Sequence, residues 1–227
     1  MLPFYASKFG AGWLERGGLF VLANIRGGGE FGPSWHQQAL KANRHKAYED
    51  FEAVATDVVK RGLCSPQTLG CMGGSNGGLL TGNMLVRSPE KFGAIVCQVP
   101  LLDMKRFSHL LAGASWMGEY GDPDKPEEWE FIKGFSPYHN VVPASKTPYP
   151  KILFTTSTRD DRVHPAHARK MVKRLHENGH GDTTFYYENI EGGHGGAANN
   201  TQSAFMSTLA YNFLWQHLSS SAAGEKQ

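Results

Sequence analysis

The chain has 227 residues, of which 40% are hydrophobic and 19% charged, and its formal net charge is +2 at pH 7. This length and composition suit one globular domain with a substantial core. The small net charge and the scattered lysines and arginines argue against a nucleic-acid-binding protein, and no run approaches the ~20 apolar residues of a membrane-spanning helix.

Short apolar runs alternate with amphipathic segments along the chain. The runs predict strands at residues 19–25, 68–72, 94–99, 152–156 and 184–190, and the periodic segments predict helices at 48–61, 77–87, 165–179 and 203–218. This order is typical of a mostly parallel sheet flanked by helices, an α/β fold.

Two segments depart from the alternation. Residues 102–142 are rich in aromatic residues, glycine and proline, and we expect a helical insertion above the sheet. Residues 219–227 are small and polar, and we expect a frayed tail after a single domain of residues 1–218. The preceding helix has an expected apolar stripe of Phe205, Leu209, Phe213 and Leu214.

Three cysteines, an odd number without metal-type spacing, argue against a disulfide framework and a zinc site. Cys71 and Cys97 lie inside apolar runs, which predicts buried free thiols. The N-terminus lacks a basic segment followed by an apolar one, so no signal peptide is visible. With Met1 as the natural start, the sequence predicts a cytoplasmic protein.

Residues 73–77, GGSNG, match G-x-S-x-G between a predicted strand and a predicted helix. This context is the one that a nucleophile elbow requires. Glycines on either side of Ser75 are expected to remove side chains that would clash in so sharp a turn. The hydroxyl of Ser75 would then project at a helix N-terminus, where developing negative charge is favoured. A Gly/Ser turn without chemistry is the alternative.

A serine nucleophile needs a base, and the base needs an orienting carboxylate. In the α/β-hydrolase order, an acid and then a histidine follow the serine. Asp160 and Asp161 follow one predicted strand, and His194 follows the next on a glycine-rich loop. We prefer Asp160, although spacing alone does not separate the two aspartates. The histidines near helices, such as His167, have an ordinary structural interpretation.

Residues 27–32 satisfy the dinucleotide-binding pattern G-x-G-x-x-G but lack its context. Such a motif opens into a helix and is followed by an acid at the end of the next strand. Here Pro33 and Trp35 follow, and the acids at that distance lie at a helix start. No Walker-type lysine or metal-ligand cluster appears either. We therefore expect neither a nucleotide nor a metal.

Several segments together resemble one family. They are ANIRGGGEFG at residues 23–32, GGSNGGLL at 73–80, tryptophan at 116 with EYG at 119–121, SPYHNV at 136–141, DDRV at 160–163 and GHG at 193–195. In this order they resemble the prolyl oligopeptidases of the S9 serine peptidases across nearly the whole chain. Asn76 favours this branch over oligopeptidase B, which usually has alanine there.

The resemblance implies an α/β-hydrolase fold and a catalytic triad of Ser75, Asp160 and His194, with no cofactor. It implies an oxyanion hole formed by the backbone N–H of Asn76 and the hydroxyl of Tyr5. A structural role is the alternative for Tyr5.

The resemblance also implies a proline-binding pocket and a short peptide substrate. Trp116 would stack on the proline ring, and Arg162 would hold a substrate carbonyl. Tyr120, Val163 and Leu101 would complete the pocket. Packing roles are the alternative for Trp116 and Tyr120.

Full-length members of this family place a β-propeller and the first strands of the hydrolase domain upstream of the segments matched here. We therefore expect an exposed sheet edge, and the missing propeller segment as a possible partner. Besides a peptidase that cleaves after proline, two other hypotheses about the function stay open. One is a related esterase, acylaminoacyl peptidase or dipeptidyl peptidase, and the other is an inactive fragment acting as a binding module.

Overall fold

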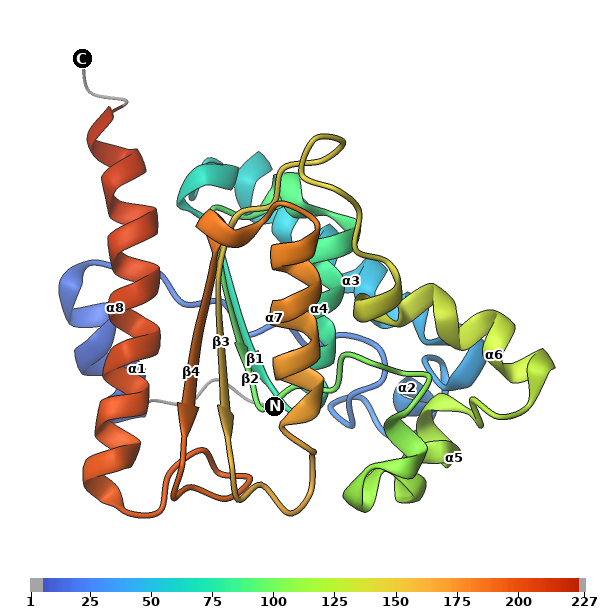
Figure 1. Ribbon diagram of the computed structural model, residues 1–227. Coiled ribbons are helices and arrows are strands. Elements are labelled where there is room, and N and C mark those ends of the chain that lie inside the picture. Colours follow the sequence, from blue (N-terminus) through green and yellow to red (C-terminus); the bar gives the residue numbers. More distant parts are fainter. Residues whose placement is uncertain (1–5, 225–227) are drawn as a thin grey trace.

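A computed structural model describes residues 6–224 and contains a four-stranded sheet (Figure 1). The strands are β1 (Gly70–Gly74), β2 (Ala94–Gln98), β3 (Lys151–Ser157) and β4 (Thr184–Asn189). They lie in chain order, and each neighbouring pair is parallel. The carboxyl ends of all four strands therefore meet at one edge of the sheet, as an α/β-hydrolase domain requires.

Helices cover both faces of this sheet. α4 (Asn76–Arg87) connects β1 to β2, and α7 (Ala166–Glu177) connects β3 to β4. Both pack on one face, with α3 (His45–Lys60) against α4. The other face is covered by α8 (Asn200–Gly224), with α1 (Ser7–Gly12) beside it (Figure 1).

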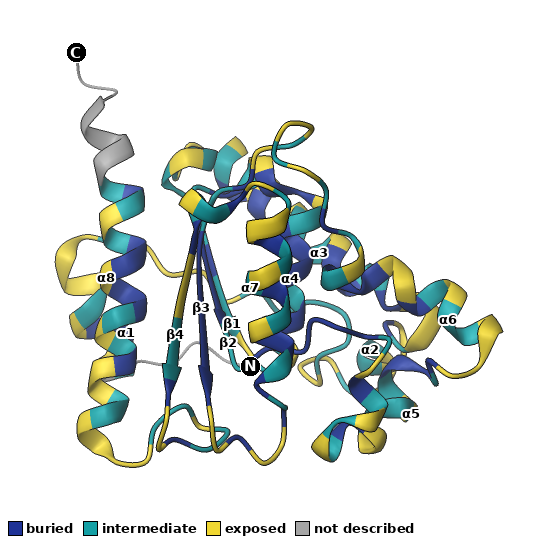
Figure 2. Cartoon of the chain, in the orientation of Figure 1, coloured by how far each residue is buried: buried dark blue, intermediate teal, exposed yellow. Residues whose placement is uncertain are grey.

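The strand residues divide the core into two layers because successive side chains point to opposite faces. Ile95 and Cys97 belong to the larger cluster under α4 and α7, whereas Ala94 and Val96 belong to a smaller cluster under α8. The central strands are therefore almost entirely buried, as the dark colour of β3 shows in Figure 2. Cys71 and Cys97 are buried free thiols, as predicted.

The insertion at residues 102–142 is helical, as predicted. It consists of short 3₁₀ helices with α5 (Met117–Tyr120) and α6 (Pro126–Ile132). These elements lie beside α4 on the side away from α8, close to α2 (Pro33–Gln37) (Figure 1). Among residues 6–224, no helix combines the length and the apolar character needed to cross a membrane.

The strand predicted at residues 19–25 is wrong. The segment forms no strand and pairs with none of the sheet, and Leu19 to Leu22 are 37–57% exposed. Its apolar run gave the signature of a buried strand, but burial also requires neighbours on both sides. Within residues 6–224 no strand lies between this segment and β1.

The C-terminal helix also differs from its prediction. α8 continues through the expected frayed tail to Gly224, because no proline or glycine interrupts the serines and alanines after Leu218. Phe205, predicted to face inward, is 50% exposed, while Met206 and Ala210 are buried. The domain boundary at residue 218 stays a prediction.

Candidate active site

Ser75 lies in the turn between β1 and α4 with φ 58° and ψ −114°, a strained conformation for a residue with a side chain. A Cβ on Gly73 would lie 2.4 Å from the carbonyl oxygen of Gly77, so the chain can approach itself here only without one. Around Gly77 there is open space. After the serine, the clash would arise at Gly78 instead of Gly77, since a Cβ there would lie 2.7 Å from Cβ of Pro100.

The structure brings Ser75, His194 and Asp160 together. Nε2 of His194 lies 3.1 Å from Oγ of Ser75, and Nδ1 lies 2.9 Å from Oδ2 of Asp160. The second carboxylate oxygen is 3.1 Å from the same nitrogen. Three side chains from separate loops thus form one continuous hydrogen-bonded chain at the carboxyl edge of the sheet.

Asp160 is held rigidly beneath the imidazole. It follows β3, its side chain is fully buried, and its Oδ1 accepts the backbone N–H groups of Arg162 and Val163, each at 2.9 Å. Asp161 is exposed. Of the two aspartates that the sequence could not separate, Asp160 is therefore the one that faces His194.

The loop that carries His194 is fixed from the end of β4. The N–H of Gly196 donates to the carbonyl of Gly193 at 2.9 Å, and Gly196 has φ 79°, where a glycine is favoured. The amide of Asn189 donates to the carbonyl of Gly196 at 3.0 Å, and its oxygen accepts the N–H of Glu191 at 3.0 Å. Asn189 thus ties both ends of the loop, a role the sequence analysis did not assign.

A cavity of about 440 Å³ opens in front of Ser75. Of the five predicted substrate-binding residues, four line it: Leu101, Trp116, Tyr120 and Arg162. The guanidinium carbon of Arg162 lies 5.9 Å from the ring centre of Trp116. Val163 does not line the cavity; it is 2% exposed and belongs to the core, because its N–H is turned to Asp160.

A polar network beside the serine escaped the sequence analysis. The side-chain oxygen of Asn76 accepts Nη2 of Arg44 at 2.6 Å and the hydroxyl of Tyr120 at 2.7 Å. Nη1 of Arg44 donates to Glu119 at 2.5 Å, and Glu119 also bonds to His36 at 2.8 Å. Burial raises the pKa of the Tyr120 phenol, so its hydroxyl stays a donor. Asn76, Glu119 and Tyr120 lie in segments that the sequence analysis singled out, whereas Arg44 and His36 carried no sequence signal.

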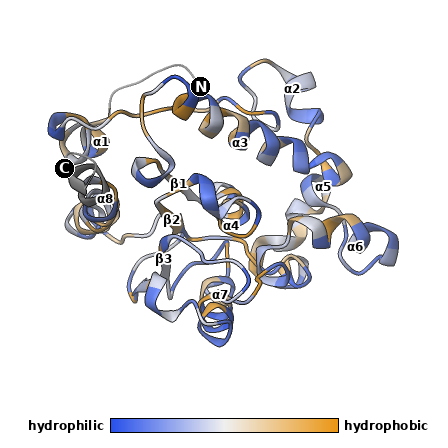
Figure 3. Ribbon diagram, turned by 90° about the horizontal axis from the view of Figure 1, so that it is seen from above, coloured by the Kyte–Doolittle hydropathy of each residue, from blue (hydrophilic) through white to orange (hydrophobic). Residues whose placement is uncertain are grey.

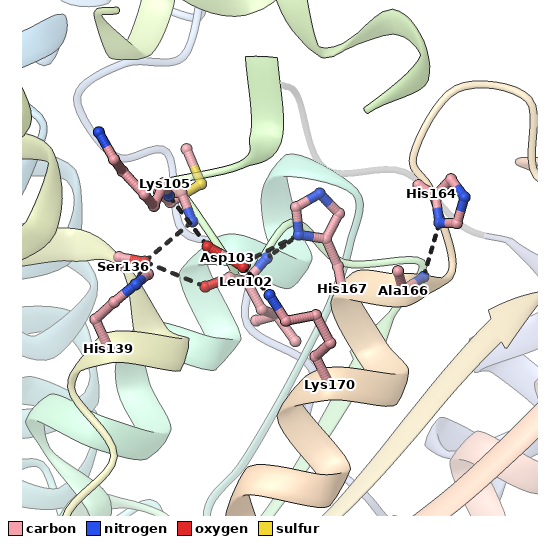
Figure 4. Close-up of polar contacts among 10 residues, drawn as sticks. Leu102, Asp103, Lys105, Ser136, His139, His164, Ala166, His167 and Lys170 are labelled. Atoms are coloured by element: carbon pink, nitrogen blue, oxygen red, sulfur yellow. Dashed lines mark hydrogen bonds and ion pairs between the residues drawn. The ribbon is translucent and has the colours of Figure 1, made fainter. Parts of the chain in front are cut away.

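A second buried network holds the segment that follows β2 and carries Leu101 (Figure 4). The N–H groups of Leu102 and Asp103 both point to Nδ1 of His167, at 3.3 and 3.1 Å. Asp103 pairs with Lys170. Burial lowers the pKa of His167 to about 4, so the ring stays neutral and Nδ1 can accept. The structural role predicted for this histidine fits its position.

Two expectations concern groups beyond these contacts. Tyr5 lies outside the described residues. Within residues 6–224, no three His, Cys, Asp or Glu side chains are placed to share a metal ion.

A parallel sheet between helical layers, with a serine on the turn from strand to helix, defines an α/β-hydrolase domain. Residues 5–221 match the sequence profile described as the prolyl oligopeptidase family, so the chain belongs to this family of serine peptidases.

The chain is 51% identical to an uncharacterized peptidase of Sinorhizobium fredii, over 96% of this chain and 30% of that protein. It is 39% identical to the prolyl endopeptidase of Dictyostelium discoideum, over 70% of this chain and 21% of that protein. A solved post-proline cleaving enzyme from Rickettsia typhi superposes with a TM-score of 0.90 at 40% identity, over 96% and 31% of the two chains. The chain therefore spans about 30% of the length of such relatives, their C-terminal domain.

Proposed function

We propose that this chain hydrolyses short peptides on the carboxyl side of proline, with Ser75 as nucleophile, His194 as base and Asp160 as orienting acid. The observation that carries the proposal is the hydrogen-bonded chain from Oγ of Ser75 through both nitrogens of His194 to Asp160. This order of donors and acceptors supplies what a serine nucleophile needs, a base with a fixed tautomer.

The proposed reaction has two half-reactions on the same groups. Nε2 of His194 takes the proton of the Ser75 hydroxyl as Oγ attacks the peptide carbonyl, and then gives it to the leaving amine. The acyl-enzyme is hydrolysed when His194 deprotonates a water molecule in the same position. Asp160 keeps the proton on Nδ1 throughout, since its own geometry is fixed by two backbone N–H groups.

The developing oxyanion requires donors close to Ser75. Asn76 is the first residue of α4, where backbone N–H groups have no partner within the helix. We assign its N–H as one donor and, from the family resemblance, the hydroxyl of Tyr5 as the other. Arg44 and Tyr120 would act as positioning residues, because together they anchor the side chain of Asn76.

The cavity in front of Ser75 supports a proline-sized pocket. Trp116 offers an aromatic face to the apolar ring, Leu101 and Tyr120 form walls, and Arg162 stands beside Trp116 with donors for a substrate carbonyl. Val163 has no direct role in this proposal.

Labelling with a fluorophosphonate tests whether the site is assembled, because such probes react with an activated serine. We expect the wild-type chain to be labelled and the Ser75→Ala variant to be silent. Ser115→Ala is the matched control, since Ser115 lines the same cavity but bonds to the carbonyl of Ala112 instead of an imidazole. An unlabelled wild-type chain would favour the inactive binding module.

Kinetics on amide substrates that differ only at the P1 residue separate proline cleavage from related activities. We expect kcat/KM for proline to exceed that for leucine by about 100-fold, the discrimination expected of a shape-matched apolar pocket. Trp116→Ala should remove most of this preference while fluorophosphonate labelling persists. Preferred turnover of acetylated amino-acid amides or simple esters would identify the chain as a related hydrolase.

A further inference from the structure

The turn that follows β2 has a strained backbone beside the cavity in front of Ser75. Val99 has φ 37°, an unusual value for a β-branched residue, and only Pro100 separates it from Leu101, which lines the cavity. Such a conformation costs free energy and persists only where the surrounding structure enforces it. The position of Leu101 therefore depends on the contacts that hold this turn.

Before Leu101, the turn is fixed by the sheet and by α4. The N–H of Val99 donates to the carbonyl of Thr155 at 2.7 Å. Pro100 lies directly against α4, because a Cβ on Gly78 would be 2.7 Å from its own Cβ. These contacts enforce the conformation on one side of the pocket residue.

Beyond Leu101, the turn is fixed by α7. The N–H groups of Leu102 and Asp103 both donate to Nδ1 of His167, at 3.3 and 3.1 Å, as the dashed lines in Figure 4 show. In the view along the strands in Figure 3, α4 and α7 lie on the same side of the sheet, opposite α8. The turn is thus held from both helices, and His167 supplies two of the hydrogen bonds from α7.

His167 is suited to accept these two hydrogen bonds. Since Nδ1 accepts, the proton of the neutral ring lies on Nε2. Burial lowers the pKa of this histidine to about 4, although the carboxylate of Asp103 favours the charged ring. Asp103 is itself paired with Lys170, and both Lys170 and His164 oppose the charged ring. The acceptor is therefore present at pH 7.

We propose that His167 is a positioning residue for substrate selection, because its imidazole fixes Leu101 as a wall of the pocket for the P1 side chain. His167 is 2% exposed and is not among the residues that line the cavity, so it acts through Leu101. The inference rests on the proposed peptidase function. It adds a residue to substrate selection and leaves the hydrogen-bonded chain at Ser75 as it is.

Kinetics of His167→Leu on amides with proline, alanine or leucine at P1 test this role. The variant leaves two buried N–H groups without a partner, so the strained turn is free to relax. We expect the ratio of kcat/KM for proline to that for leucine to fall at least about tenfold. The fall should come from a higher KM for the proline substrate, while kcat changes less than about threefold and fluorophosphonate still labels Ser75.

Two amide variants separate the acceptor from the volume of the side chain. His167→Asn keeps an acceptor oxygen near the position of Nδ1, and we expect it to retain the preference for proline to within about threefold. His167→Gln has the same amide one bond further from the backbone, and we expect it to lose the preference as His167→Leu does. This pair keeps the test decisive if His167→Leu does not fold.

His180→Leu is the matched control for the loss of a buried ring. His180 is also 2% exposed, and its Nε2 bonds to the carbonyl of Val142 at 2.9 Å. It lies before β4, however, at the amino edge of the sheet and away from the cavity. We expect this variant to lose stability in denaturant unfolding but to keep the ratio of the wild type.

Three results would overturn the proposal. The first is an unchanged ratio in His167→Leu and His167→Gln, and the second is an equal fall in His180→Leu, which would assign the effect to stability. The third is a wild-type chain that hydrolyses none of these amides, which would overturn the proposed function as well. A wild type that prefers another P1 residue would contradict proline cleavage alone, and a loss of that preference in His167→Leu would still support the role of His167.

Discussion

β1 has two surfaces that differ in how completely this chain supplies their partners. At its carboxyl end, Ser75, His194 and Asp160 form a continuous hydrogen-bonded chain whose last member is itself held by two backbone N–H groups. Along its other edge, β1 pairs with no strand among residues 6–224, and apolar side chains of α3 and α8 line a cavity of about 590 Å³ beside it. The three side chains at the end of the strand have their partners within residues 6–224, and its edge does not.

The difference shows that the arrangement of these three side chains and the completeness of the sheet are separate properties. The three side chains of the candidate site come from the segments that follow β1, β3 and β4. The outer edge of β1 contributes none of these three side chains. The candidate site can therefore be assembled although the outer edge of β1 has no partner strand within residues 6–224. The following substitutions test the candidate site and the rest of the fold separately.

The largest effect is expected at Asp160. Asp160→Asn should lower kcat on a proline amide substrate by about 10⁴-fold, because an amide in this position favours the wrong tautomer of the base. Asp161→Asn should have no effect, since Asp161 is exposed and faces no imidazole. Steady-state kinetics of both variants measure the contrast. Equal losses would show that the aspartate at 160 has no special place in the site.

A smaller effect concerns the neutral His167 and the stability of the fold. Its pKa is about 4 in the folded chain, because of burial, against an ordinary value of 6.5. Between these values the unfolded chain binds the proton and the folded chain does not, so the free energy of unfolding falls as the pH drops from 6.5 to 4. The loss is on the order of 3 kcal/mol.

The contribution of His167 is measured as a difference between variants, by denaturant unfolding at several pH values. His167→Asn keeps an acceptor for the two backbone N–H groups but does not titrate, so the fall in stability should become shallower. His45→Asn, at a histidine whose side chain is 45% exposed, should follow the wild type. A His167→Asn profile as steep as that of the wild type would assign the acid sensitivity to other groups.

Arg44 should have an intermediate effect on catalysis. Arg44→Met leaves Asn76 with the hydroxyl of Tyr120 as its remaining anchor and removes a partner of Glu119. We expect kcat to fall about 10- to 100-fold, as small displacements of a catalytic donor do, while KM changes little. Arg61→Met, at an arginine on the surface, is the control. A rise in KM with unchanged kcat would indicate a substrate-binding role instead.

The smallest effect is expected at Val21, which lines the apolar cavity beside β1. Val21 is 43% exposed, so Val21→Thr should change the free energy of unfolding by less than about 0.5 kcal/mol. Val96 on β2 is fully buried, and Val96→Thr should cost about 2 kcal/mol because its hydroxyl would lose water without gaining a partner. Similar costs in denaturant unfolding would mean that residues 19–25 already form a packed part of the sheet.

The sequence by itself determined the alternation of strands and helices, the serine elbow and the order of the three polar residues. These features depend on local patterns: apolar periodicity marks β2, β3, α4 and α7, and glycine at position 73 marks a turn too tight for a Cβ. The predicted family is confirmed because its motifs extend along nearly the whole chain.

Tertiary structure alone decided which partners each segment meets. It turned Asp160 rather than Asp161 to His194, placed Val163 in the core, and joined Arg44 to Asn76 across 32 positions of the chain. Residues 19–25 carry the pattern of a buried strand and yet form no strand of the sheet. The physical reason is that an apolar run gives a segment the composition of a buried strand. Whether the segment is buried and paired depends on neighbours that are distant in sequence.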